Sequence, residues 1–176
     1  MVESHKHSDS KFDLYWDLIQ DGKCANVEYT IGRTRTDILA EINSYTAAIE
    51  IQYTPISIAS ILHRMQEHTN KGMYTIWLFP EDVFNNKNKI RNLKWIRFIQ
   101  TLQEGVLFLL KGGEIIPARL DNSLRYINNT VAASRKILDV QKPLFLEELT
   151  FKRNEIYDVN ITTINEWWLS SYVELL

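Results

Sequence analysis

The sequence predicts an α/β fold, with a central mixed sheet that is flanked by helices. Three short segments that alternate between apolar and polar residues follow one another closely, joined by Gly32 and by Asn43-Ser44, as the strands of a meander are. A continuous apolar run over 73–79 comes after the next amphipathic segment, and it is typical of a strand that is buried on both faces. These observations indicate the order helix, three strands, helix and strand.

The first predicted helix has two rows of apolar residues. Leu14 and Leu18 form one row, a second row consists of Phe12, Trp16 and Ile19, and Asp21-Gly22 follows as an end signal. The predicted elements of this part are a helix over 4–20, strands over 27–31, 36–43 and 46–54, a helix over 57–71 that begins after Pro55 with Ser57 as its cap, and a strand over 73–79.

The second half of the chain is predicted as a C-terminal helix-plus-hairpin extension that packs on this core. Apolar periodicity indicates a helix over 88–104, and Gly112-Gly113 between two apolar segments indicates a hairpin over 105–120. The stretch 123–165 reads as partly irregular, and the tail 164–176 is predicted as a short helix. We therefore divide the chain into a core over 1–82 and an extension over 83–176.

Composition limits the classes of function. The net charge of −2 excludes a general attraction to nucleic acid, so any such binding needs a local basic patch. The single cysteine, Cys24, excludes a disulfide within the chain and a cysteine-based zinc site. The N-terminal segment lacks the apolar region of a secretory signal, and no apolar run is long enough for a membrane span. We expect a soluble, cytoplasmic protein.

Two carboxylates on neighbouring predicted strands are the first candidates for chemistry. Glu50 and Gln52 share one face of their strand because side chains alternate with a period of two, and Asp37 begins the strand beside it. Mg²⁺ binds hard oxygen ligands and is often held by one or two carboxylates together with substrate phosphate and water. An ordinary half-exposed strand has the same alternation, so spacing alone leaves both interpretations open.

A longer pattern favours the first interpretation. The segments HSDSK (7–11), VEYTIGRTRTDIL (27–39), AIEIQYTPIS (48–57), Arg64 and TIWLF (75–79) occur in this order at close spacing. This pattern resembles the nuclease domain of the CoiA-like competence family, a branch of the PD-(D/E)XK phosphodiesterases. The resemblance covers about residues 3–80 and continues more weakly through 105–122. One departure is His68, which stands where the family pattern leads us to expect an aromatic residue.

The resemblance implies both a fold and an activity. The core would be a restriction-endonuclease-like PD-(D/E)XK domain, and the protein a divalent-metal-dependent DNA endonuclease, resolvase-like in recombination or competence. Asp37 and Glu50 would bind Mg²⁺ or Mn²⁺, and Gln52 would take the usual lysine position. Two alternatives stay open: a nucleic-acid-binding module of this fold that cleaves weakly or not at all, and a partner-binding protein that uses its aromatic tail.

A glutamine in the lysine position leaves the site short of one positive charge. His7 and Lys11, together with Glu3, share a helix face that continues into the buried leucine row, so we expect it to aim Lys11 and His7 at the sheet edge. Both would then be catalytic helpers; a solvated helix end is the alternative. Glu28 matches an acidic family position and would bind a second metal ion or orient Lys11, unless it is a surface residue of an edge strand.

Nucleic-acid contacts are expected from two basic groups. Arg33 and Arg35 flank the carboxylates, and guanidinium groups pair well with phosphate oxygens. The segment 87–97 contains five cations and no acid, with Lys87, Arg91 and Lys94 on one helical face. The expected partner is duplex or branched DNA, although solvated faces would look the same. The tail aromatics Trp167, Trp168 and Tyr172 are expected to pack on the body or on the second subunit of a homodimer.

Overall fold

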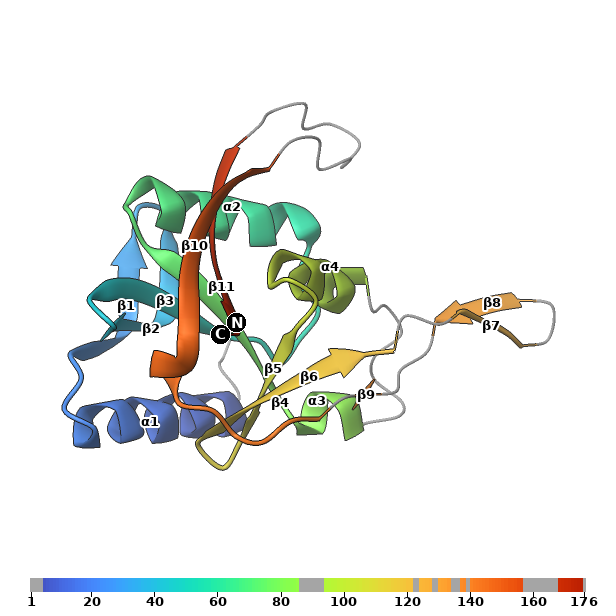
Figure 1. Ribbon diagram of the computed structural model, residues 1–176, viewed down its shortest axis with the longest axis horizontal. Helices are drawn as coiled ribbons and strands as arrows, with labels where there is room; N and C mark the ends of the chain where they lie inside the picture. The colour runs from blue at the N-terminus through green and yellow to red at the C-terminus, as the bar shows by residue number, and fades with distance from the viewer. Residues whose placement is uncertain are drawn as a thin grey trace.

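The computed structural model describes residues 5–85, 94–121, 124–127, 130–133, 137–138, 140–156 and 168–175 (Figure 1). Its elements are α1 (His5–Gln20), β1 (Ala25–Ile31), β2 (Thr34–Ile42), β3 (Tyr45–Ile51), α2 (Ile58–Asn70), β4 (Tyr74–Pro80), α3 (Asp82–Asn85), α4 (Lys94–Leu102), β5 (Leu107–Lys111), β6 (Glu114–Leu120), β7 (Leu124–Ile127), β8 (Thr130–Ala133), β9 (Ile137–Leu138), η1 (Leu146–Glu148), β10 (Leu149–Ile156) and β11 (Trp168–Leu175).

A seven-stranded mixed sheet with the strand order β1-β2-β3-β4-β5-β6-β9 forms the centre of the molecule. The strands β1, β2 and β3 are an antiparallel meander, β4 runs parallel to both β3 and β5, and β6 is antiparallel to β5. The α1 helix covers one face of this sheet, while α2 and α4 cover the other (Figure 1). The predicted α/β fold, with a mixed sheet flanked by helices, is therefore confirmed.

Alternating side chains of the sheet fill two separate cores. Leu14 and Leu18 of α1 pack with Ile38, Ile49 and Ile76 on one face. On the other face, Met65 of α2 and Trp95 of α4 pack against Trp77 of β4. Strand β4 contributes to both cores, which explains the continuous apolar run in its sequence.

Local signals account for the boundaries near the site. The Ser57 hydroxyl accepts a hydrogen bond from the Ser60 N–H at 3.0 Å and caps α2. Asn43 and Ser44 both have positive φ, at 51° and 67°, as two-residue hairpin turns require. Gly32 in the β1–β2 turn has a φ of 57°, and a Cβ atom there would overlap the Glu67 carboxylate of α2. The β1–β2 hairpin can therefore lie close to α2.

Some predicted elements were wrong in detail. Of the two predicted apolar rows of α1, only the leucine row is buried, whereas Phe12 and Trp16 are 41% and 55% exposed. The predicted tail helix is instead strand β11, which pairs with β10 over its whole length and lies against α2 and β4. The strand β3 ends at Ile51 rather than at residue 54, and the short helix α3 follows β4.

The tail was misassigned because its apolar spacing suits either a helix or a strand, and β10 supplies the backbone partners that stabilise a strand. Trp168 and Tyr172 lie in β11, and Trp167 lies outside the described residues.

The sheet runs on from β4 into β5 and β6, which form the predicted hairpin around Gly112-Gly113. The division of the chain at residue 82 stays a prediction, and it falls between two neighbouring strands of one sheet. Among the helices that the structure describes, none is long and apolar enough to cross a membrane.

Candidate active site

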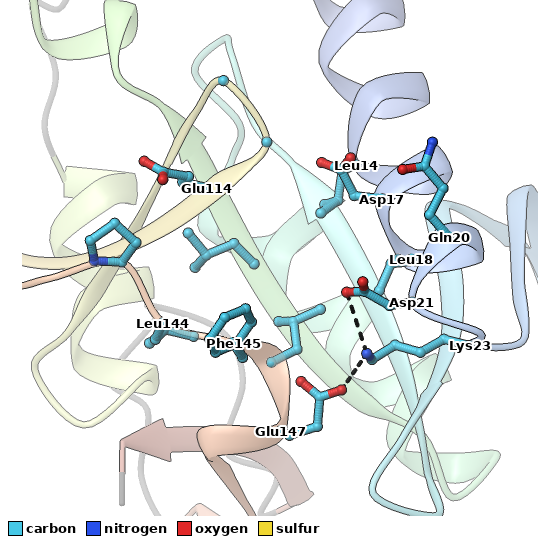
Figure 2. A pocket seen from close by; sticks show the side chains of 15 residues that line it. Leu14, Asp17, Leu18, Gln20, Asp21, Lys23, Glu114, Leu144, Phe145 and Glu147 are labelled. Carbon is cyan, nitrogen blue, oxygen red and sulfur yellow. Dashed lines mark ion pairs between the residues drawn. The ribbon is translucent and has the colours of Figure 1, made fainter.

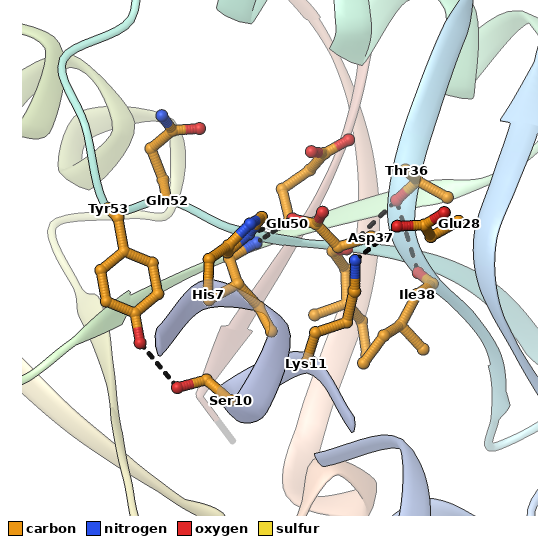
Figure 3. Close-up of polar contacts among 12 residues, drawn as sticks. His7, Ser10, Lys11, Glu28, Thr36, Asp37, Ile38, Glu50, Gln52 and Tyr53 are labelled. Atoms are coloured by element: carbon orange, nitrogen blue, oxygen red, sulfur yellow. Dashed lines mark hydrogen bonds and ion pairs between the residues drawn. The ribbon is translucent and has the colours of Figure 1, made fainter. Parts of the chain in front are cut away.

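Three carboxylates form a row across β1, β2 and β3. The β1–β2 register, with Val27 opposite Ile38, places Glu28 opposite Asp37. The β2–β3 register, with Ile38 opposite Ile49, places Asp37 opposite Glu50. Figure 3 shows these side chains close together beside the N-terminal part of α1.

The sheet opens at this row because β2 and β3 separate after the Ile38–Ile49 pair. Two side chains of β2 then take over as partners of the β3 backbone. The Thr36 hydroxyl donates to the Ile49 carbonyl at 3.1 Å, and Asp37 Oδ2 accepts from the Ile51 N–H at 2.8 Å. Asp37 is therefore held at the opening, with its side chain 20% exposed.

Glu50 is the most buried of the three carboxylates, at 2% exposure. Its Oε2 accepts a hydrogen bond from Arg64 Nη1 at 2.7 Å, and its Oε1 has no hydrogen-bond partner in the described part of the chain. Burial raises the pKa of Glu50 to about 8, although the Arg64 guanidinium opposes the shift, and the Asp37 carboxylate adds to it. A nearby cation would favour the ionised form.

This burial predicts a pH dependence of stability in EDTA. The pKa of Glu50 rises from 4.5 to about 8 on folding, so the folded state favours the protonated carboxyl. The stabilisation that this form contributes is lost as the pH rises through that range. Burial lowers the pKa of His68 from 6.5 to about 4, so the folded state favours the neutral ring. The stabilisation that His68 contributes is therefore complete above pH 6.5 and does not change between pH 6.5 and 8. Between pH 6.5 and 8, urea denaturation should therefore show unfolding free energy falling by about 2 kcal/mol. Glu50→Gln should flatten this slope, and an equal slope in both proteins would contradict the assignment.

Lys11 is almost fully buried, at 1% exposure, and pairs with the first carboxylate of the row. Its Nζ lies 2.7 Å from Glu28 Oε1, and Arg35 Nη1 lies 3.2 Å from Glu28 Oε2. The hydrogen bond from Lys11 is the main cause that lowers the pKa of Glu28. Glu28 has a φ of 54° within β1, an uncommon backbone conformation that brings its side chain to Lys11.

His7 lies at the other end of the same helix face. Its Nε2 is 3.4 Å from Asp37 Oδ2, and its ring meets the Tyr53 ring edge-on at a centroid distance of 5.5 Å. The Tyr53 hydroxyl is 2.6 Å from the Ser10 hydroxyl (Figure 3). The first turns of α1 are therefore attached to the sheet on both sides of the carboxylates, and Lys11 and His7 do lie at the sheet edge.

Gln52 lies apart from this group. It follows the last residue of β3, and its side-chain amide donates to the Thr54 carbonyl at 2.6 Å (Figure 3). Its backbone N–H donates to the Leu78 carbonyl at 2.9 Å, which fixes the start of the connection to α2. In this structure Gln52 thus supports the connection to α2.

The carboxylate row offers the oxygen ligands that a divalent cation prefers. Asp37 and Glu50 offer carboxylate oxygens, and the buried Glu50 Oε1 lacks a hydrogen-bond partner among the described side chains and backbone groups. Within the described residues, no group of three His, Cys, Asp or Glu side chains is gathered into a complete metal cage. Two carboxylates that leave further positions to water and phosphate fit Mg²⁺ or Mn²⁺ better than a structural metal.

Most of the chain also matches a protein family. The model of the nuclease-like domain of competence protein CoiA matches residues 3–154. The chain belongs to this family. No curated protein and no solved structure matches it. The family match extends well beyond the residues that carry the resemblance in the sequence, and it includes the β5–β6 hairpin.

The CoiA nuclease-like domain has an open depression next to the row. It is lined by Arg33, Thr34, Arg35, Ile56, Ala59, Ser60, His63 and Arg64. Four of these eight residues are basic and none carries a carboxylate, so the depression suits an anion. Arg35 and Arg64 also touch Glu28 and Glu50, and the depression therefore borders the carboxylates directly.

Sequence reasoning assigned no function to two of the site residues. Arg64 was part of the family pattern without a role, and His68 was noted only as a departure. Their spacing of four residues on one helix was the signal, because it places both side chains on one face of α2.

The basic stripe predicted over residues 87–97 stays a prediction. Lys94 is exposed at the start of α4, and Lys87 and Arg91 lie outside the described residues.

A second pocket lies at the other end of α1 (Figure 2). It has leucine side chains in its wall, and Lys23 forms ion pairs there with Asp21 and Glu147. None of its lining residues belongs to the carboxylate row. Glu114, which lines this pocket, therefore serves as a control position for variants of the candidate site.

Proposed function

We propose that this CoiA nuclease-like domain is a divalent-metal-dependent DNA endonuclease that hydrolyses phosphodiester bonds. The observation that carries the proposal is the row of Glu28, Asp37 and Glu50 where the sheet opens, with Lys11 buried beside it. Family membership supports a nuclease-related role. Duplex or branched DNA, in recombination or competence, is the proposed substrate, and the cytoplasm is the proposed compartment.

Each residue of the site has a part in this proposal. Asp37 and Glu50 would hold Mg²⁺ or Mn²⁺, with Glu28 as an additional acidic partner. A bound divalent ion supplies charge neutralisation at the scissile phosphate and lowers the pKa of the attacking water. Lys11 brings a positive charge to the end of the row, where it offsets negative charge that develops on the phosphate. His7, 3.4 Å from Asp37, is placed to exchange a proton at the edge of the site.

The basic depression would hold the DNA strand. The guanidinium groups of Arg35 and Arg64 contact Glu28 and Glu50, and Arg33 lines the same depression, so a phosphate bound there would be next to the scissile one in the strand. This arrangement lets a protein with an overall negative charge bind DNA through one local patch.

The direct test is a cleavage assay on plasmid and branched DNA with Mg²⁺, Mn²⁺, Ca²⁺ or EDTA. We expect cleavage with Mg²⁺ or Mn²⁺ and none with EDTA. DNA binding in Ca²⁺ without cleavage in Mn²⁺ would instead favour the binding module, in which the Gln52 side chain keeps its bond to the Thr54 carbonyl. No DNA binding at low salt would contradict both.

The depression leads to a separate prediction for DNA affinity. The double variant Arg33→Ala/Arg35→Ala should weaken binding to all sequences about equally and make its salt dependence shallower, by roughly one unit of log–log slope for each phosphate that the variant no longer binds. Fluorescence anisotropy at several salt concentrations measures both quantities. Arg119→Ala, at an exposed arginine of β6, is the control. If both variants behave alike, the depression is not the DNA site.

A further inference from the structure

The α2 helix presents two residues, one turn apart, to the two oxygens of Glu50. Arg64 Nη1 lies 2.7 Å from Oε2, and His68 Nε2 lies 3.8 Å from Oε1. Each oxygen therefore faces a different side chain of the same helix. The role of Arg64 is clear from its ion pair, whereas the activity proposed above makes no use of His68.

His68 is fully buried, and its Nε2 has no hydrogen-bond partner among the residues that the structure describes. The facing Glu50 Oε1 also has none. Two buried polar atoms without partners are costly, at roughly 1–3 kcal/mol each. Their separation of 3.8 Å is too short to admit a water molecule, and a small rotation of the carboxylate would bring the atoms to hydrogen-bond distance.

The partner of the other ring nitrogen, Nδ1, determines whether His68 carries its proton on Nε2. Its Nδ1 lies 3.0 Å from the hydroxyl of Thr75, a fully buried residue of β4. The neutral ring carries one N–H, and its two nitrogens face the Thr75 hydroxyl and Glu50 Oε1. If the Thr75 hydroxyl donates to Nδ1, the proton is on Nε2 and points at Glu50.

We propose that His68 is a positioning residue that holds the Glu50 carboxylate through Oε1, with Thr75 selecting the ring tautomer. The inference rests on the proposed function in taking Glu50 as a metal ligand. Partners of this kind orient ligating carboxylates and typically change metal affinity by about 10- to 100-fold. A phenylalanine at this position would fill similar space and donate no hydrogen bond.

The first test compares Mn²⁺ affinity by calorimetry in His68→Phe and His68→Gln. Phenylalanine keeps the ring volume without a donor, whereas glutamine loses volume but keeps an N–H group. We expect His68→Phe to raise the Kd by about 10- to 100-fold and His68→Gln to stay within a few-fold of the original protein. The opposite order would mean that His68 serves only packing. Thr75→Val should fall between them, with Thr101→Val on the exposed face of α4 as its control.

The second test needs no metal. Nitrogen-15 spectra of the histidine rings at pH 9 in EDTA should show His68 with its proton on Nε2, the nitrogen that faces Glu50. The Glu50→Gln variant should change this signal. A proton on Nδ1 would overturn the proposal. If the protein binds no Mn²⁺ while the Nε2 tautomer is present, the metal site is wrong and the hydrogen bond to Glu50 stands.

Discussion

Glu50→Gln is expected to lower metal-dependent cleavage on the order of a thousandfold and to abolish Mn²⁺ binding. The variant keeps the shape of the side chain and an acceptor for Arg64, but it removes the charge that a divalent cation needs. Asp37→Asn should have a similar effect on both quantities. Cleavage rates at saturating DNA and calorimetric titration with Mn²⁺ measure the two losses independently.

The control for this experiment is Glu114→Gln, an exposed glutamate of β6 that lines the pocket at the other end of α1. It removes the same charge from the same protein and should leave metal binding and cleavage unchanged. Unaltered Mn²⁺ binding in both Asp37→Asn and Glu50→Gln would refute the assignment of the metal site. Abolished binding with retained cleavage would mean that the chemistry does not depend on these ligands.

Lys11→Ala is expected to reduce turnover on the order of a hundredfold, as removal of a charged helper does in other active sites. The ammonium group is buried and 2.7 Å from Glu28, and Gln52 supplies no charge in its place. Lys11→Met tests the charge alone, because methionine retains most of the buried aliphatic chain. Both variants should affect the turnover number far more than the affinity for DNA.

A second change makes this prediction specific. If Lys11 compensates for the glutamine in the usual lysine position, Gln52→Lys should restore part of the activity that Lys11→Ala loses. The structure makes this a demanding test, because the Gln52 side chain now bonds to the Thr54 carbonyl and would have to turn toward Glu50. Full activity in Lys11→Met would remove Lys11 from the mechanism.

The parts of the fold that could be predicted from the sequence depend on local signals. The turn at Asn43-Ser44, the cap at Ser57 and the alternation around Glu50 each involve neighbouring residues, and they led to the right meander and helix. The paired carboxylates followed because adjacent strands of a short hairpin must lie side by side. The position of Lys11 followed from the leucine row on its own helix.

Contacts between distant elements could not be predicted in this way. The approach of Arg64 and His68 to Glu50 depends on how α2 packs across the sheet, and nothing in the local sequence encodes that distance. The β10–β11 pairing joins segments on either side of residues 157–167, and helical and strand spacing agree equally well with the tail. Gln52 comes directly after β3, and strand alternation alone could not predict the bond of its side chain to the Thr54 carbonyl.

The bond between Asp37 Oδ2 and the Ile51 N–H couples the chemistry of the site to the local stability of β3. This amide is protected by a side chain rather than by a neighbouring strand, so its hydrogen-exchange rate reports the state of a single carboxylate. A cation that binds the Asp37 carboxylate would alter this exchange rate. The exchange rates of amides deeper in β3, such as that of Ile49, would stay the same. Occupancy of the site can thus be followed at one backbone position, without substrate and without turnover.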